Sequence, residues 1–193
     1  MLGYCQSSRF AGLYSDFLGK ALTTDLDSMF RIKSSFKDKI EIKAPLPVVR
    51  NFFSQLTNFT DMLPGVESIR RETAGVMRWT IATDTPVGNV RFSFPVRETS
   101  PNVNTIEWSP ALNEDQNLLR YSLRLEELNG ATVVDVSQQV ELRRKRAWEL
   151  HPGVALMGET RLTNALSKRI NAAIEDFLVR VKEKLEAEDN SHR

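Results

Sequence analysis

Hydrophobic and polar residues alternate along much of the chain between residues 37 and 143, a pattern typical of β-strands with one buried face. The segment KDKIEIKA (37–44) places Ile40 and Ile42 on one face and charged residues on the other. Further segments repeat this alternation, and Asn129-Gly130 between the last two is a strong hairpin signal. We predict additional strands over residues 66–72, 76–83, 89–98, 104–109, 117–127 and 131–143, which would form an antiparallel sheet covered on one face.

Two regions have helical periodicity instead. Pro45 and Pro47 interrupt the first strand, and apolar residues then recur every three or four positions up to Pro64-Gly65, which predicts two short helices. After residue 153 no strong helix breaker follows, and about 30 helical residues would span roughly 45 Å. Only a long, curved sheet can bury one face of such a helix along its whole length. Its apolar stripe consists of Leu162, Leu166, Ile170, Ala173, Ile174, Phe177, Val181 and Leu185.

The predicted order is therefore a strand, two short helices, a six-stranded meander and one long C-terminal helix. Because strands and helices are grouped apart, the fold class is α+β, with a curved antiparallel sheet of about six or seven strands wrapped on the long helix. We assign residues 36–188 to one domain, residues 1–35 to a helical N-terminal extension and residues 189–193 to a disordered tail.

The N-terminal extension carries apolar residues at helical spacing from Phe10 to Phe30. It could pack on the domain as a helix or be partly disordered, and a helix that docks on a membrane surface or a protein partner is the alternative. The acidic residues Asp16, Asp25 and Asp27 argue against a targeting segment.

Composition narrows the functional classes. Of the 193 residues, 41% are hydrophobic and 26% are charged, and the formal net charge of +1 provides no bulk attraction for nucleic acid. No apolar run is long enough to span a membrane. The single Cys5 excludes an internal disulfide, and with only His151 and His192 we expect no metal and no cofactor. A reducing compartment such as the cytoplasm is the default, and an organellar lumen stays open.

Three segments carry a resemblance to a known superfamily. They are IEIKAPLPVVRNFF (40–53), with its Ala-Pro after the first strand, DMLPGVESI (61–69), with its Leu-Pro-Gly turn, and HPGVALMGETRL (151–162), which leads into the last helix. Together they resemble the START-like (SRPBCC) superfamily, the helix-grip fold of polyketide cyclases, Bet v 1-like allergens and lipid-transfer domains. The branch that they resemble best is the family of the G-type subunit of carbon monoxide dehydrogenase. The resemblance covers about residues 36–187 and implies a cavity between sheet and long helix for a lipid, quinone, polyketide or other hydrophobic molecule.

The inward faces of the predicted strands carry large aromatic side chains, which either fill a core or line such a cavity. Gln138 and Thr83 favour a cavity, because a polar group on a dry face needs a partner, which for Gln138 could be Tyr121, a water or a ligand oxygen. We therefore predict transport, sequestration or presentation of a hydrophobic small molecule. The candidate ligand-binding residues are Met62, Leu63, Trp79, Ile81, Phe92, Phe94, Trp108, Tyr121, Leu123, Val136, Gln138, Leu162, Leu166 and Ile170.

A cyclase- or dehydratase-like enzyme is the first alternative. It requires an acid or base inside the cavity, but the inward faces carry no carboxylate and no histidine in mid-strand. Asp38 shares the face of Ile40 but lies at the start of its strand, and His151 precedes Pro152 in a turn. No catalytic residue is therefore predicted.

An accessory protein that docks on a membrane or partner is the second alternative. Besides residues 1–35, the run Arg143–Arg146 could contact anionic lipid. The simpler interpretation is a solvated loop whose charge is reduced by Glu141 and Glu149, and no nucleic-acid partner is predicted.

The Leu-Pro-Gly turn raises a question of its own. Met62 and Leu63 place large apolar side chains at a turn, where polar residues are usual. Pro64-Gly65 either only ends a helix, or the turn forms a gate at the edge of the cavity.

Overall fold

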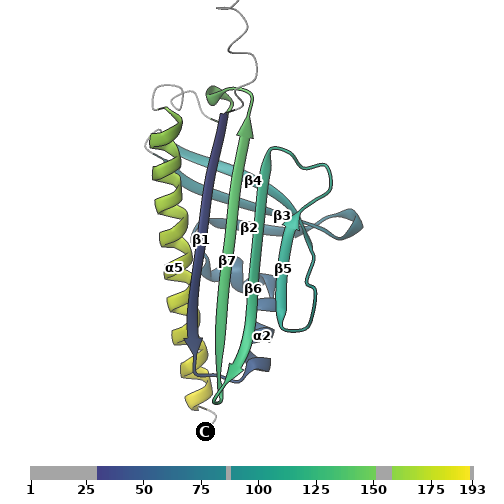
Figure 1. The fold of residues 1–193 in the computed structure, drawn as a ribbon, viewed down its shortest axis with the longest axis vertical. Coiled ribbons are helices and arrows are strands. Elements are labelled where there is room, and N and C mark those ends of the chain that lie inside the picture. Colours follow the sequence, from purple (N-terminus) through teal and green to yellow (C-terminus); the bar gives the residue numbers. More distant parts are fainter. Residues whose placement is uncertain (1–29, 86–87, 151–157, 192–193) are drawn as a thin grey trace, which may run out of the picture.

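A computed structural model describes residues 30–85, 88–150 and 158–191. Within these ranges the chain forms a seven-stranded antiparallel sheet in the order β1-β7-β6-β5-β4-β3-β2 (Figure 1). The predicted α+β layout, with two short helices after the first strand and a long last helix, is confirmed. The elements are β1 (Phe30–Ile42), α2 (Leu46–Ser54), α3 (Leu56–Met62), β2 (Val66–Arg71), η1 (Thr73–Gly75), β3 (Val76–Thr85), β4 (Gly88–Glu98), β5 (Thr105–Pro110), β6 (Asn117–Leu128), β7 (Ala131–Arg144), η2 (Ala147–Glu149) and α5 (Glu159–Ser191).

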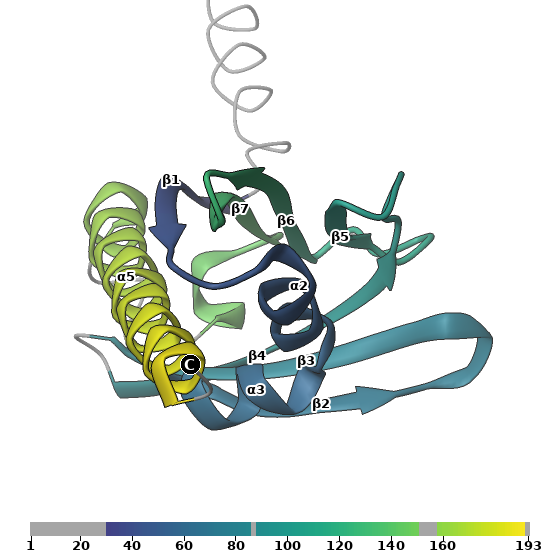
Figure 2. The ribbon, with the colours of Figure 1, turned by 90° about the horizontal axis from the view of Figure 1, so that it is seen from below.

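The sheet is strongly curled. Seen from below, β1, β7 and β6 lie on one side of the interior and β2, β3 and β4 on the other, with α2 between them (Figure 2). Helix α5 runs beside β1 along the side that the sheet leaves open (Figures 1 and 2). The inward faces of the strands and the apolar stripe of α5 therefore enclose one common interior.

Strand β1 begins earlier than the sequence indicated. It starts at Phe30, not near residue 36, and pairs with β7 from Phe30↔Arg144 to Ile42↔Thr132. The helical interpretation of Phe30 and the assignment of residues 30–35 to the N-terminal extension are thus wrong. The polar Ser34 occupies an inward, buried position and hides the period-two pattern there. The rest of the extension, residues 1–29, lies outside the described residues.

The C-terminal boundary also differs from the prediction. Helix α5 continues to Ser191, so residues 189–191 are helical and do not belong to a disordered tail. The turn predicted at Pro152-Gly153 lies outside the described residues. Where the structure resumes, the buried side of α5 is the predicted stripe, since Leu162, Leu166 and Phe177 are at most 2% exposed.

Polar contacts attach α5 to the free edge of β1. The Ser167 hydroxyl donates to the Lys33 carbonyl oxygen (3.3 Å), and the Lys182 ammonium donates to the Glu41 carbonyl oxygen (2.8 Å). Just beyond the strand, the backbone N–H of Lys43 donates to Glu186 Oε1 (2.9 Å). An edge strand exposes unpaired backbone groups, and these contacts satisfy two of the β1 carbonyl oxygens and fix the helix along the strand.

Phe59 of α3 is at the centre of the core. Its ring centroid lies 5.3 Å from that of Phe177 on α5, 5.4 Å from that of Trp79 on β3 and 5.8 Å from that of Tyr121 on β6. Phe59 is only 1% exposed. This one side chain therefore joins both sides of the curled sheet to the helix, with ring pairs that each contribute about 0.5–1.5 kcal/mol beyond their buried area.

Replacing Phe59 should test this arrangement. We expect Phe59→Ala to lower the free energy of unfolding by about 3–5 kcal/mol, because the surrounding rings cannot all collapse into the space left. Leu112→Ala, at a side chain that is 76% exposed, is the control and should change stability by less than about 0.5 kcal/mol. Urea denaturation followed by circular dichroism measures both, and equal midpoints for the two variants would contradict the central role of Phe59.

Candidate ligand-binding site

A cavity lies between the inner face of the sheet, the turn after α3 and the first half of α5. Its volume is about 90 Å³, counted as the space open to the centre of a water molecule. The wall is mostly apolar, and the side chains come from all these elements, including Phe92 of β4, Leu119 of β6 and Ala173 of α5. The space is narrow, with room for several water molecules or the thin part of a larger molecule.

Many of the predicted site residues lie in this wall. The curl of the sheet brings inward residues from distant strands together, as antiparallel alternation implies. The predicted residues that line the cavity are Leu63, Trp79, Ile81, Phe92, Phe94, Tyr121, Gln138, Leu166 and Ile170. Thr83, noted in the sequence as a polar residue on a dry face, also lines it.

Other predicted residues lie elsewhere. Leu123 and Val136 are fully buried, as partners in the β6–β7 register, but the cavity does not reach them. Helix α2 packs against these two strands, and its buried side chains Val49, Phe52 and Phe53 occupy part of the interior. The remaining predicted residues that are absent from the wall are Trp108 and Leu162, which are buried in the core, and Met62, which packs partly buried against it.

Sequence reasoning missed several residues of the wall. Ile32 and Ser34 of β1 were assigned to the N-terminal extension, and alternation extended back from Ile40 would have found them. Phe59 also lines the cavity, and its helical spacing before Pro64 does not indicate this. Arg169 lies beside the stripe of α5, and no sequence signal identifies it as part of the wall.

Among the described residues, five buried side-chain polar atoms lack a hydrogen-bond partner; three of them belong to this wall, and the other two are Arg97 Nε and Asn171 Oδ1. Within the described part of the chain, Ser34 Oγ, Trp79 Nε1 and Tyr121 Oη make no hydrogen bond, and their side chains are 7%, 3% and 5% exposed. Gln138 is opposite Tyr121 in the β6–β7 register, yet the two are not hydrogen-bonded, so the suggested Gln138–Tyr121 pair does not form. Burial raises the pKa of the Tyr121 hydroxyl far above its ordinary value, so it stays protonated. These groups can serve as hydrogen-bond donors inside an apolar space.

The Leu-Pro-Gly turn forms part of the cavity wall through Leu63 and Pro64. Gly65 has φ +87°, and a Cβ atom there would lie 2.6 Å from the carbonyl oxygen of Ala82. The Gly65 carbonyl also accepts a hydrogen bond from the Ala82 N–H (2.8 Å). The turn is thus held tightly against β3, and a role as a gate stays a prediction.

On the β3 side of the cavity, the polar contact of helix α5 is a single long ion pair among the described residues. The Arg169 guanidinium lies 3.9 Å from the Asp84 carboxylate of β3, and both side chains are at least half exposed. Exposed ion pairs of this kind contribute little to stability. On the other side of the cavity, α5 has direct hydrogen bonds with β1 and with Lys43 just beyond it.

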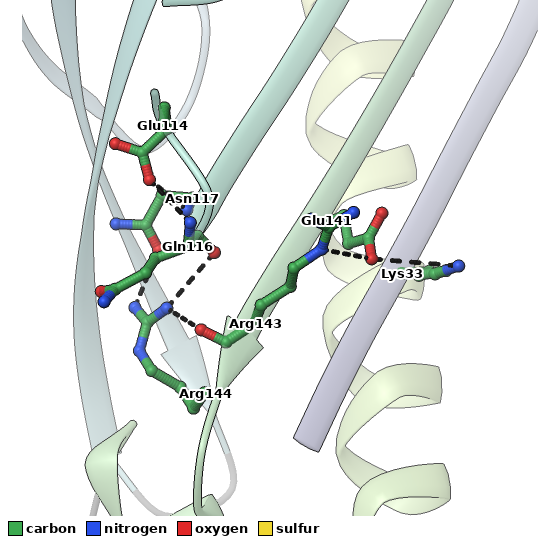
Figure 3. Close-up of polar contacts among 7 residues, drawn as sticks. All are labelled: Lys33, Glu114, Gln116, Asn117, Glu141, Arg143 and Arg144. Carbon is green, nitrogen blue, oxygen red and sulfur yellow. Dashed lines mark hydrogen bonds and ion pairs between the residues drawn. The ribbon is translucent and has the colours of Figure 1, made fainter. Parts of the chain in front are cut away.

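The run Arg143–Arg146 is partly used inside the fold (Figure 3). Arg143 donates to Glu141 Oε1 (2.8 Å), and this hydrogen bond lowers the pKa of the Glu141 carboxyl. Arg144 donates to the backbone oxygens of Gln116 (3.3 Å) and Arg143 (2.7 Å) and to Asn117 Oδ1 (2.8 Å). Only the second half of the run is exposed, which leaves a smaller cationic surface than the sequence indicated.

The other chemical alternatives have little support among the described side chains. Asp38 is exposed, accepts the Lys39 N–H and is absent from the cavity wall, while His151 lies outside the described residues. In those same ranges, no three His, Cys, Asp or Glu side chains gather closely enough to hold a metal ion. None of the helices described is sufficiently long and apolar to cross a membrane.

Solved structures with the same architecture exist, although the sequence itself matches no family model and no curated protein. The di-domain aromatase/cyclase StfQ of steffimycin biosynthesis superposes with a TM-score of 0.57 at 11% identity, over 82% of this chain and 52% of StfQ. The di-domain aromatase/cyclase BexL of BE-7585A biosynthesis superposes with a TM-score of 0.52 at 18% sequence identity. The match covers 80% of this chain and 50% of BexL. A conserved protein from Geobacillus kaustophilus superposes with a TM-score of 0.53 at 13% sequence identity. The match covers 78% of this chain and 94% of that protein.

This chain has the START-like helix-grip fold. It spans about half the length of the two di-domain proteins. At these identities the likeness concerns the fold alone, which hosts different activities. The helix-grip fold accounts for the position of the cavity, between the curled sheet and α5. The resemblance to the carbon monoxide dehydrogenase branch is not tested by these comparisons and stays a prediction.

The close approach of Gly65 to β3 leads to a test. Gly65→Ala should lose more stability than Gly130→Ala, because both positions have positive φ but only Gly65 also meets a backbone oxygen. We expect about 1–3 kcal/mol from the backbone conformation in each case and a further loss from the clash at Gly65. Thermal and urea unfolding measure both variants, and equal losses would show that β3 can move away from the turn at no cost.

Proposed function

We propose that this protein binds a hydrophobic small molecule in the cavity between sheet and α5, for transport, sequestration or presentation. The observation that carries the proposal is the group of buried, unpartnered polar atoms of Ser34, Trp79 and Tyr121 within one apolar wall. Burying a polar group without a hydrogen bond costs free energy, and a bound molecule can supply the missing partner. Apolar walls with a few polar groups are typical of small-molecule sites.

The narrow volume of the cavity implies that a larger ligand must widen it. The attachment of α5 is uneven, since the Ser167–Lys33 and Lys182–Glu41 contacts hold it to β1, whereas towards β3 there is the exposed Arg169–Asp84 pair. Movement of the first half of α5 away from β3 would therefore break the exposed Arg169–Asp84 pair and leave the hydrogen bonds to β1 in place. A lipid, quinone or polyketide could enter by this side.

Catalysis of a cyclase or dehydratase type is less well supported. The aromatase/cyclases among the structural neighbours make it the natural alternative. The side chains that line the cavity include Tyr121 and Arg169, but in the described ranges they include no carboxylate and no histidine. Because the Tyr121 pKa is raised, its hydroxyl is a poor general acid or base near neutral pH. Binding is therefore the better supported function.

A variant that fills the cavity should test the proposal. Ala173 lines the cavity, and Ala173→Leu places extra atoms there, so it should lower the affinity for the neutral dye Nile red about tenfold, roughly 1.4 kcal/mol. Ala172→Leu, at the neighbouring exposed position of α5, is the matched control and should bind like the wild type. Dye fluorescence measures the affinity.

Native mass spectrometry of the purified protein gives an independent measurement. We expect a hydrophobic molecule that co-purifies with the wild type and is depleted in Ala173→Leu but retained in Ala172→Leu. If the wild type carries no such molecule and Nile red binds all three proteins equally, the cavity is not a binding site and the proposed function is wrong.

A further inference from the structure

The unpartnered polar side chains are built into three different strands of the cavity wall. Ser34 lies on β1, Trp79 on β3 and Tyr121 on β6, and each is more than nine-tenths buried. Trp79 and Tyr121 both pack on Phe59, with ring centroids 5.4 and 5.8 Å from its own. Ser34 pairs with Val140, two residues beyond Gln138, which is itself opposite Tyr121. All three residues belong to the wall of the same cavity.

The chemistry of these groups restricts what they can hold. The indole N–H of Trp79 is only a donor, and the hydroxyls of Tyr121 and Ser34 can each donate one proton. All three are uncharged, and the raised Tyr121 pKa keeps that hydroxyl from ionising. The Trp79 N–H can only donate and both hydroxyls can turn a proton towards a ligand, so all three suit an oxygen that only accepts, as in a ketone, quinone or ester.

A charged group is a poor fit for the same space. The side chains that line the cavity contain one cation, Arg169, within the residues that the structure describes. Its guanidinium is half exposed and faces Asp84 at 3.9 Å, so its charge is already partly compensated outside the interior. A carboxylate placed beside Trp79 and Tyr121 would be buried without a counter-ion, which is costly.

We infer that Ser34, Trp79 and Tyr121 form a subsite for an uncharged, carbonyl-type acceptor oxygen, so that the ligand is a neutral hydrophobic carbonyl compound bound with its oxygen innermost. The inference rests on the proposed function and adds the chemical class of the ligand and its orientation. The N–H of Trp79 and the hydroxyl of Tyr121 or Ser34 donate to the oxygen, and the apolar wall holds the rest of the molecule.

Small matched probes can test the subsite. Indane and 1-indanone share the same small fused bicyclic skeleton and differ by the carbonyl oxygen. Indane-1-carboxylate carries a negative charge on the same skeleton. Their dissociation constants are measured by protein-observed NMR titration against the wild type, Tyr121→Phe and Ser34→Ala. Tyr121→Phe removes only the buried hydroxyl, and Ser122→Ala, at the next position of β6 and outside the cavity wall, is the control for loss of a hydroxyl.

The expected result is a selective loss. Tyr121→Phe should raise the dissociation constant of 1-indanone by about threefold to tenfold, the effect of one hydrogen bond. The dissociation constant of indane should stay the same or fall. Ser34→Ala should also raise the dissociation constant of 1-indanone, and Ser122→Ala should change the affinity for neither probe. Indane-1-carboxylate should bind the wild type more weakly than 1-indanone. The carbonyl stretch of bound 1-indanone should lie at lower frequency than in hexane, and part of this shift should disappear in Tyr121→Phe.

The two levels of the proposal fail differently. Suppose that indane and 1-indanone both bind the wild type, and that Tyr121→Phe and Ser34→Ala change the two affinities by the same factor. The acceptor subsite is then wrong, while binding in the cavity stands. Tighter binding of the carboxylate than of the ketone would also overturn the subsite. If neither probe binds and the wild type also fails to take up Nile red, the subsite and the proposed function are both wrong.

Discussion

The pairing of β1 with β7 along 13 residues is the constraint on which the rest of the structure depends. It adds an edge strand to the curled meander and offers α5 a row of free backbone groups. Ser167, Lys182 and Glu186 use that row, so the helix is fixed on the β1 side of the opening. The β3 side is then closed mainly by apolar packing, and there the cavity forms.

The unpartnered hydroxyls of the cavity wall have a physical cost. Elsewhere aromatic rings such as Phe59 and Phe177 fill the interior efficiently, and buried hydroxyls find partners, as Thr132 does by donating to the Ala44 carbonyl oxygen (2.8 Å). In the cavity wall, Ser34 and Tyr121 leave hydroxyls without one in the described structure. Such groups are unfavourable for folding alone, which is why they point to a ligand rather than to stability.

The structural neighbours and the cavity support different levels of the conclusion. StfQ and BexL share the fold at low sequence identity, and the fold by itself assigns no reaction. The functional proposal depends on the side chains of this cavity, where neutral donors are present and carboxylates are absent from the described wall. In the run Arg143–Arg146, a candidate docking surface in the sequence, Arg144 instead donates hydrogen bonds to Gln116 and to Asn117 at the start of β6.

The sequence by itself determined the strands, their inward faces and the buried stripe of α5, because alternation and helical periodicity are local patterns that burial of one face imposes. It also sufficed for the START-like fold. It failed at β1, where the inward Ser34 masked the period, and it did not separate Tyr121, which lines the cavity, from Leu123, two residues along the same face. Alternation specifies the face of a strand but not the depth at which a residue lies. Only the tertiary structure decided that depth, because it depends on how far α2 fills the interior and on which side α5 is fixed.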